Sequence, residues 1–287
     1  MVVNTVQEYE WETLRNSMVP LLIVGIILFI VYRLLKIFQV YYATVFNKPL
    51  FTYRFFQLNR LTSNQRAILK NEHATYRALS PKDKRQFEHR VATFIDKNTF
   101  IGRQELVVTD QMKVKVAATA TMLSFGFKNY HLDIIEIVVL YPKVYYSQIN
   151  KAYHKGEINP RLKTIVFSWE DFLHGYEIGD DNLNLGIHEF GHAIHLNASR
   201  KSDISSLIFN RGFKNLTEYL QHNESVRQDL IASKYFRAYA YTNQYEFFAV
   251  LLENFIETPS EFKSQFPVLF KLLKQMLNFK FSLNSDK

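Results

Sequence analysis

The stretch LGIHEFGHAIHLNA, residues 185–198, places three histidines and one glutamate within eight residues. His188 and His192 are four residues apart, so on a helix both imidazoles lie on one face and can reach one metal ion. Glu189 points to the adjoining sector, where its carboxylate could contact metal-bound water without being a ligand. This HExxH spacing predicts a zinc site with Glu189 as its general base. Because the chain has no cysteine, all ligands must be histidine or carboxylate.

His195 is the third histidine of this stretch, and it shares the helix face of His188. Seven residues of helix rise about 10.5 Å, whereas Zn–N bonds are about 2.0–2.1 Å long, so these two histidines could hardly share one ion. The longer motif HExxHxxGxxH fits no better, because His195 occupies its glycine position and Ala198 its last histidine position. We therefore expect His195 to lie beside the site, supporting a ligand or only packing against it.

The positions that flank the motif are apolar: Leu185, Ile187, Phe190 and Ile194. The two histidines should therefore face a packed interior. A buried histidine pair beside a glutamate is costly without a cation or hydrogen-bond partners. Hydrogen-bonded core histidines are the alternative interpretation, and the metal site is favoured over it.

The third ligand has to come from elsewhere in the chain. The downstream acidic and histidine side chains to consider are Asp203, Glu218, His222, Glu224, Asp229, Glu246, Glu253 and Glu257. Residues 244–256 are apolar on nearly all sides, so they predict a buried helix in which an ionised glutamate needs a strong partner. Glu246, Ala249 and Glu253 share one stripe of that helix, and the small Ala249 would let another helix approach closely. Glu246 is therefore the expected ligand, and Glu253 is expected either to support a ligand or to pair with an arginine or lysine.

A membrane segment is expected near the N-terminus. Residues 18–32 carry no charge, and two leucines extend the apolar stretch past Arg33. The sequence predicts a short tail at 1–17 and one transmembrane helix over 18–35. A cleaved signal peptide or a buried core helix fits less well, because the leader is acidic and no small-residue cleavage site follows.

Charge indicates the orientation of this span and the class of partner. The residues after the span are basic, and the first acidic one is Glu72. The positive-inside rule therefore places the C-terminal part in the cytoplasm. The formal net charge is +8, but the basic residues are scattered rather than arranged in a stripe. Nucleic acid is therefore not an expected partner, whereas an anionic lipid surface explains the excess charge as well.

The sequence after the span, residues 36–287, predicts an α+β fold that is mostly helical with a small β-sheet. A juxtamembrane region is expected over 36–75 and the catalytic domain over 76–287. Helices are expected over 61–79, from Ser80-Pro81 onward, from Thr109 to Gly126, and over the histidine motif. Strands are expected over 134–142 and 163–169, because both runs are rich in β-branched and aromatic residues.

Several segments, in order, resemble the Mlc titration factor family of zinc-dependent peptidases. They are FIGRQELVVTDQMKVKVAATATMLSFG, VVLYP, FSWEDFLHG, NLNLGIHEFGHAIH and YAYTNQYEFFAVLLENFIETPSEF. The resemblance implies a zincin-like domain, similar to the catalytic domain of anthrax lethal factor, with Zn²⁺ bound by His188, His192 and Glu246. It also implies that Tyr239, seven residues before that glutamate, assists catalysis. The sequence departs from the family in two places: His195 stands where an aspartate is usual, and the membrane span is added.

The function expected is that of a membrane-anchored zinc metallopeptidase of the gluzincin type, which cleaves peptides or proteins. Tyr239 would donate a hydrogen bond to the developing oxyanion, unless its ring is simply packed among neighbouring aromatic residues. One alternative is a non-enzymatic, membrane-tethered protein whose zinc site, closed by a fourth protein ligand, helps it bind a partner such as a transcription repressor. Another is a different zinc hydrolase.

Overall fold

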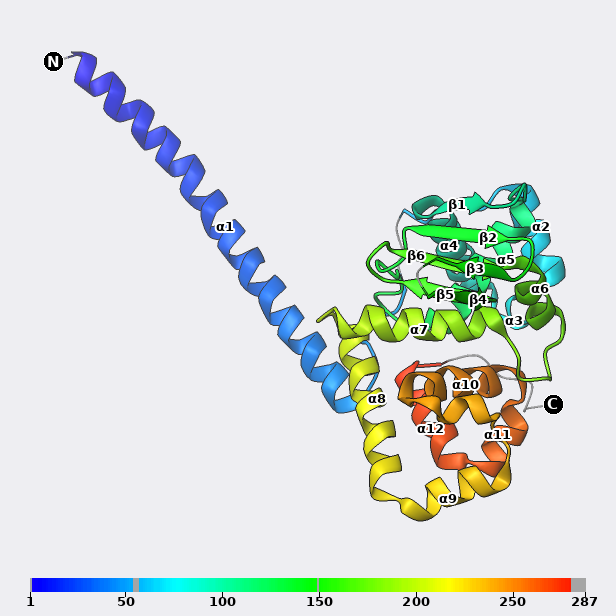
Figure 1. Cartoon of the computed structure of the whole chain (residues 1–287). Coiled ribbons are helices and arrows are strands. Elements are labelled where there is room, and N and C mark those ends of the chain that lie inside the picture. The colour runs from blue at the N-terminus through cyan, green and yellow to red at the C-terminus, as the bar shows by residue number, and fades with distance from the viewer. Residues whose placement is uncertain (1, 54–56, 149, 280–287) are drawn as a thin grey trace. The chain divides into compact units, whose positions relative to one another are not determined.

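The computed structural model describes residues 2–53, 57–148 and 150–279, and it divides into two units that meet between Phe46 and Asn47. The first unit is helix α1 (Val2–Phe46), drawn in blue in Figure 1. Within it, Leu14–Phe46 is long and apolar enough to cross a membrane, and no side chain of its most apolar window is buried. The expected apolar helix of membrane-spanning length is therefore present. It contains residues 18–35 and continues beyond them.

The second unit contains, among its described residues, a four-stranded sheet in the order β1-β2-β6-β5. Strands β1, β2 and β6 are parallel, and β5 pairs antiparallel with β6 at the sheet edge. The strand bounds are Thr99–Gly102 (β1), Ile137–Tyr141 (β2), Gly156–Asn159 (β5) and Thr164–Ser168 (β6). Strands β3 (Tyr145–Ser147) and β4 (Ala152–His154) form a separate antiparallel pair. The two strands expected from the sequence are confirmed as β2 and β6.

Successive side chains of β2 and β6 point to opposite faces of the sheet, and both faces are covered. Leu140 of β2 and Phe167 of β6 are completely buried in the main core, on the side of the helices. Val139 and Val166 face the other way and pack with Tyr145 in a small second cluster. The helical layer therefore covers one face of the sheet, and β3 contributes to the other.

The N-terminal helices of this unit begin where capping signals predict. Ser80 caps α4 (Pro81–Lys97) and Thr109 caps α5 (Asp110–Ser124), each through its side-chain oxygen. The prediction of a single helix over 61–79 is wrong, because this segment forms two helices, α2 (Ser63–Glu72) and α3 (Ala74–Ala78). His73 has an extended backbone that ends α2, and its imidazole accepts a hydrogen bond from the amide of Tyr76 in α3.

From Trp169 onward the described chain is helical, apart from short connections. It comprises α6 (Trp169–Glu177), α7 (Leu185–Ser199), α8 (Ile204–His222), α9 (Glu224–Ser233), the 3₁₀ helix η1 (Ala238–Thr242), α10 (Gln244–Glu257), α11 (Pro259–Gln265) and α12 (Pro267–Met276). Helix α7 runs between the sheet layer and the C-terminal helices, as Figure 1 shows. The α+β architecture, mostly helical with a small sheet, is confirmed.

Helices α7 and α10 cross closely at two small residues. A Cβ atom added to Gly191 of α7 would lie 3.6 Å from the Cα of Ala249 and 2.9 Å from a methyl of Leu252. The predicted close approach at Ala249 is confirmed. This crossing brings the histidines of α7 next to the acidic stripe of α10.

Candidate metal centre

Helix α7 is fixed at its start by Asn184, whose side chain accepts a hydrogen bond from the amide of Ile187 at 3.0 Å. The apolar face of the helix, including Phe190 and Ile194, is buried in the core. His188 and Glu189 are also buried, at 8% and 7% exposure. The motif side chains therefore lie in the interior, at the crossing with α10.

Three ligand atoms converge at this crossing. The Nε2 atom of His188 lies 3.0 Å from the Oε2 atom of Glu246, and the Nε2 atom of His192 lies 3.4 Å from the same oxygen. The two imidazole Nε2 atoms are 3.2 Å apart. In a tetrahedral zinc site with bonds of about 2.0–2.1 Å, neighbouring ligand atoms are roughly 3.3 Å apart. The three atoms are therefore spaced as three corners of such a site.

Glu246 is placed by the cap of α10. The side chain of Asn243 accepts hydrogen bonds from the amides of Tyr245 and Glu246, which sets the first turn. The Oε2 atom of Glu246 is buried, and its contacts with the imidazoles do not meet hydrogen-bond geometry. A buried carboxylate oxygen without a hydrogen bond is costly, and a cation at this point would satisfy it.

Electrostatics at the cluster follow from these contacts. Burial lowers the pKa of His188, but the close contacts with the carboxylates of Glu246 and Glu253 outweigh it and raise the pKa to about 9. Burial by itself would raise the pKa of Glu246, but the two histidines outweigh this effect and hold its pKa well below the usual range. Burial raises the pKa of Glu189, and the nearby histidines only partly offset this effect. A glutamate with a raised pKa is suited to accept and return a proton.

Glu189 does not belong to the three converging atoms but lies against the sheet edge. A Cβ atom added to Gly156 of β5 would lie 2.8 Å from the Cγ atom of Glu189 and 2.9 Å from its Oε1 atom. Only a glycine lets the strand pass this close. Sequence reasoning missed Gly156, because the segment around it has weak strand propensity.

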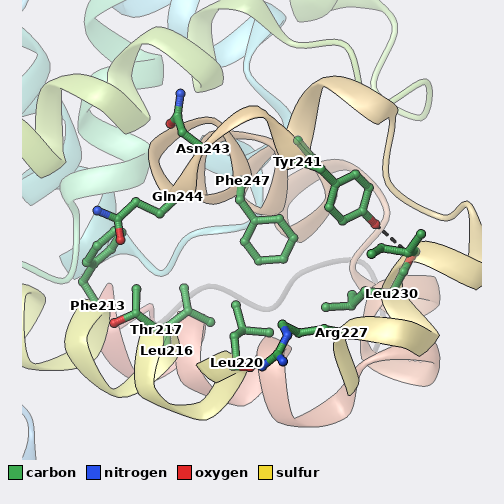
Figure 2. Close-up of a pocket in the computed structure, with 12 residues that line it drawn as sticks. Phe213, Leu216, Thr217, Leu220, Arg227, Leu230, Tyr241, Asn243, Gln244 and Phe247 are labelled. Carbon is green, nitrogen blue, oxygen red and sulfur yellow. Dashed lines mark hydrogen bonds between the residues drawn. The ribbon is translucent and has the colours of Figure 1, made fainter. Parts of the chain in front are cut away.

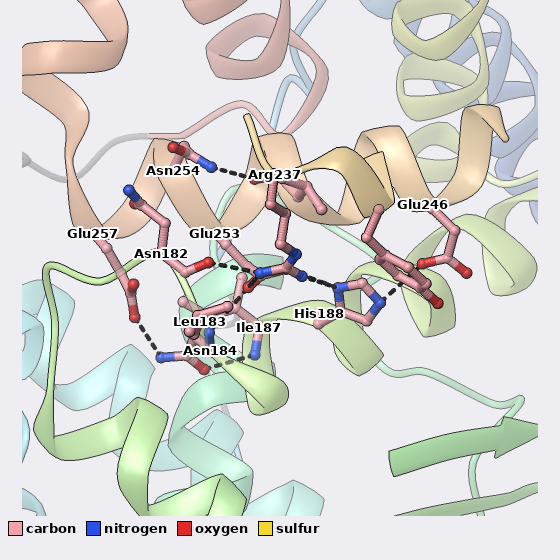
Figure 3. A network of polar contacts seen from close by, with 12 residues as sticks. Asn182, Leu183, Asn184, Ile187, His188, Arg237, Glu246, Glu253, Asn254 and Glu257 are labelled. Carbon is pink, nitrogen blue, oxygen red and sulfur yellow. Dashed lines mark hydrogen bonds and ion pairs between the residues drawn. The ribbon is translucent and has the colours of Figure 1, made fainter. Parts of the chain in front are cut away.

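Glu253 both supports a proposed metal ligand and pairs with an arginine, the two roles that the sequence left open for it. Its Oε1 atom lies 2.7 Å from the Nδ1 atom of His188, and its carboxylate pairs with Arg237. Figure 3 shows the His188 ring reaching toward Glu246 on one side and toward Arg237 and Glu253 on the other. Arg237 was missed from the sequence: a buried glutamate signals that a cation is needed, but it does not say which one.

Tyr239 lies on η1, with its ring centroid 6.0 Å from that of His188. Its side chain is half exposed, and burial together with the charge of Glu246 and a hydrogen bond to it raises the pKa to about 12. The neighbouring Tyr241 points elsewhere and donates to the carbonyl of Leu230. Tyr239 thus stands beside the cluster with its hydroxyl protonated at neutral pH.

His195 lies outside the three converging atoms, in an aromatic group. Its ring centroid is 4.4 Å from that of Phe213 and 4.9 Å from that of Tyr245. Its Nδ1 atom is buried without a hydrogen-bond partner among the described residues. Burial, with a smaller effect of His192, lowers its pKa to about 4. These contacts are those of a neutral packed ring, and a supporting role at the metal stays a prediction.

A cavity of about 580 Å³ opens beside the cluster. It is lined by Gly156, His188, Glu189, Tyr239 and residues of β4 and α6. A second cavity, of about 280 Å³, lies between α8, α9, η1 and α10 (Figure 2). Its described lining is mainly apolar and contains no histidine or carboxylate. The groups that can do chemistry therefore gather in the first cavity.

Comparisons with known proteins show the family of the chain. The model of a family described as glucose-regulated metallo-peptidase M90 matches residues 52–278. An uncharacterized protein of Synechocystis sp. is 23% identical over 237 residues, covering 75% of this chain and 83% of its own. Mlc titration factor A of Serratia proteamaculans is 24% identical over 213 residues, covering 67% and 80%. The resemblance found from the sequence motifs is confirmed, and the protein belongs to the glucose-regulated metallo-peptidase M90 family.

Proposed function

We propose that this protein is a zinc-dependent metallopeptidase whose metal ligands are His188, His192 and Glu246. The observation that carries the proposal is the spacing of their three ligand atoms, 3.0–3.4 Å, at the crossing of α7 and α10. Two imidazoles and one carboxylate are a donor set typical of catalytic zinc, which keeps a further position open.

His188, His192 and Glu246 would hold the zinc ion, which would supply the Lewis acidity that makes water a nucleophile at neutral pH. Glu189 is the proposed general base: it accepts the proton of the attacking water and returns it to the nitrogen of the leaving amine. Its buried position beside Gly156 and its raised pKa support both transfers. This assignment also gives the glutamate a purpose that a purely structural zinc site does not require.

Tyr239 is the proposed donor to the carbonyl oxygen as that atom gains negative charge. Its high pKa keeps the phenol proton available, and its half-exposed position on the cavity allows contact with substrate. The cavity of about 580 Å³ is open enough for a peptide segment, so peptides or proteins are the proposed substrates.

The membrane is the proposed location. Residues 18–35 would span it, with 1–17 outside, a juxtamembrane region over 36–75, and the catalytic domain over 76–287 in the cytoplasm. The length and apolar surface of α1 support the span, and the basic residues that follow it support the orientation.

A regulatory protein partner is a second proposal. The Serratia relative is named a titration factor of Mlc, which suggests binding of a protein partner. Such binding could accompany peptidase activity or replace it. A protein that only binds would lose nothing when Glu189 is changed.

The experiment pairs metal analysis with a peptide-library digest of the full chain in detergent, comparing wild type with Glu189→Gln. We expect both proteins to hold zinc and only the wild type to cleave peptides. Glu261→Gln is the matched control, because this exposed glutamate does not line the cavity and lies outside the cluster. Equal cleavage by wild type and Glu189→Gln would contradict the proposed mechanism.

A further inference from the structure

Arg237 contacts three of the segments that surround the proposed metal ligands. Its Nη1 atom donates to the Oε2 atom of Glu253 at 2.8 Å, and its Nη2 atom donates to Oε1 at 2.7 Å. This is a two-point contact between a planar guanidinium and a planar carboxylate, which fixes the orientation of both groups. Glu253 is only 1% exposed, so the pair is shielded from solvent on the carboxylate side.

The same pair determines how His188 is held. Its Nδ1 atom lies 2.7 Å from Glu253 and 3.3 Å from the Nη2 atom of Arg237. Guanidinium nitrogens only donate, and one Nδ1 atom cannot both donate to Glu253 and accept from Arg237. The shorter contact indicates that the Nδ1 proton goes to Glu253. The Nε2 atom, which faces Glu246, is then the atom that can bind a metal ion once it has lost its proton.

Arg237 also reaches the segments on either side. Its Nη1 atom donates to the carbonyl of Asn182 at 2.7 Å, in the loop that leads into α7. Its Cζ atom lies 5.9 Å from the ring centroid of Tyr239, two residues further along η1. One side chain therefore links the start of α7, the carboxylate that holds His188, and the helix that carries Tyr239.

We propose that Arg237 is a positioning residue for the metal centre: it holds the carboxylate of Glu253 in place against His188. The inference rests on the proposed function, because it assumes that His188 binds the metal. Supporting groups of this kind commonly change metal affinity about 10- to 100-fold. Lysine should not replace Arg237 fully, because an ammonium lacks the planar fork.

Metal affinity can be measured apart from activity with Co²⁺, whose visible absorption reports on the geometry of its ligands. The full chain in detergent is titrated with Co²⁺ as wild type, Arg237→Met, Arg237→Lys, Glu253→Gln and the double variant Arg237→Met/Glu253→Gln. Arg227→Met is the matched control, because this arginine also donates to backbone carbonyls but lies on α9, outside the metal centre. Thermal unfolding of each protein reports whether it is folded.

We expect Arg237→Met to weaken Co²⁺ binding about 10- to 100-fold and to alter the absorption bands, with Arg237→Lys intermediate and Arg227→Met within about twofold of wild type. If Arg237 acts through Glu253, the double variant should lose no more than the weaker-binding single variant. If Arg237→Met does not fold, Arg237→Lys gives the answer.

Wild-type affinity and absorption in folded Arg237→Met or Arg237→Lys would overturn the inference and leave the proposed function standing. Losses that add fully in the double variant would overturn the route through Glu253. Absence of Co²⁺ binding by the wild type would overturn the proposed function and this inference together.

Discussion

His188 is held between two carboxylates of one helix. Its Nε2 atom lies 3.0 Å from Glu246 and its Nδ1 atom 2.7 Å from Glu253, both on α10. The two glutamates are seven residues apart, about two helical turns, so their side chains bracket the ring from opposite ends. This arrangement accounts for two of the three glutamates of α10, Glu246 and Glu253.

Gly156 offers a test of the position of Glu189. Replacing it with alanine places a methyl 2.8 Å from the Cγ atom of Glu189, so one of the two must move. A displacement on the order of 1 Å can cost about 100-fold in rate. We expect Gly156→Ala to lower kcat about 10- to 100-fold while zinc stays bound.

Gly179→Ala is the control for this change, because a Cβ atom there meets nothing within 4 Å. Peptide cleavage and zinc content are measured for both variants. Unchanged kcat in Gly156→Ala would mean that Glu189 does not act from this position.

His195 is predicted to act as a packed ring. Since its ring lies among aromatic side chains and its Nδ1 atom makes no hydrogen bond, His195→Phe should keep zinc affinity and change the free energy of unfolding by less than about 1 kcal/mol. His195→Asp should destabilise the protein by roughly 1–3 kcal/mol, because it puts a carboxylate in an apolar group. Denaturant unfolding and zinc competition check both. A large loss of zinc affinity in His195→Phe would instead make His195 part of the site.

Glu257 should make stability depend on pH. Burial, more than the nearby carboxylates, raises its pKa from 4.5 to about 7 in the folded protein. Below the unfolded value both states are protonated and nothing is lost. As pH rises toward 7 the unfolded carboxyl ionises first, so the folded state loses stability relative to the unfolded state.

Glu257→Gln should therefore stabilise the protein above neutral pH, by roughly 1–3 kcal/mol, and have little effect near pH 4.5. The free energy of unfolding is compared at the two pH values, with the exposed Glu261→Gln as control. The same gain at both pH values would rule out titration of Glu257 as its cause.

Zinc binding should compete with protons. In the metal-free protein the pKa of His188 is about 9, so this imidazole must lose a proton before it binds an ion. Apparent zinc affinity should rise about tenfold per pH unit between about pH 6.5 and about pH 8.5. Competition with a chelating dye measures it. An affinity that does not change over this interval would exclude His188 as a ligand that carries a proton in the metal-free state.

Local signals in the sequence predicted much of this site. His188 and His192 are four residues apart on one helix, and Ala249 shares the stripe of Glu246 and Glu253 on another. Each is a pattern along a single helix, so the sequence alone reveals it. The caps at Ser80 and Thr109 were predictable for the same reason. The break at His73 was not, because an imidazole that caps a helix is not among the usual start signals.

The contacts that depend on the path of the chain could not be predicted. Arg237 reaches Glu253 only because it precedes η1, which packs against α10, and no spacing rule selects this arginine among the others. Gly156 matters only because the edge strand β5 passes Glu189. The surroundings of His195 could not be predicted either. Its place in the motif suggested a role at the metal, whereas α8 and α10 surround its ring with aromatic side chains.

The zinc content of the folded full chain tests the central claim most directly. Metal analysis should find about one zinc per wild-type chain, as a single site with three protein ligands requires. His192→Ala and Glu246→Ala should each retain less than about a tenth of that, while Glu261→Gln retains all of it. Well-folded wild-type protein without zinc, or full zinc content in Glu246→Ala, would contradict the account.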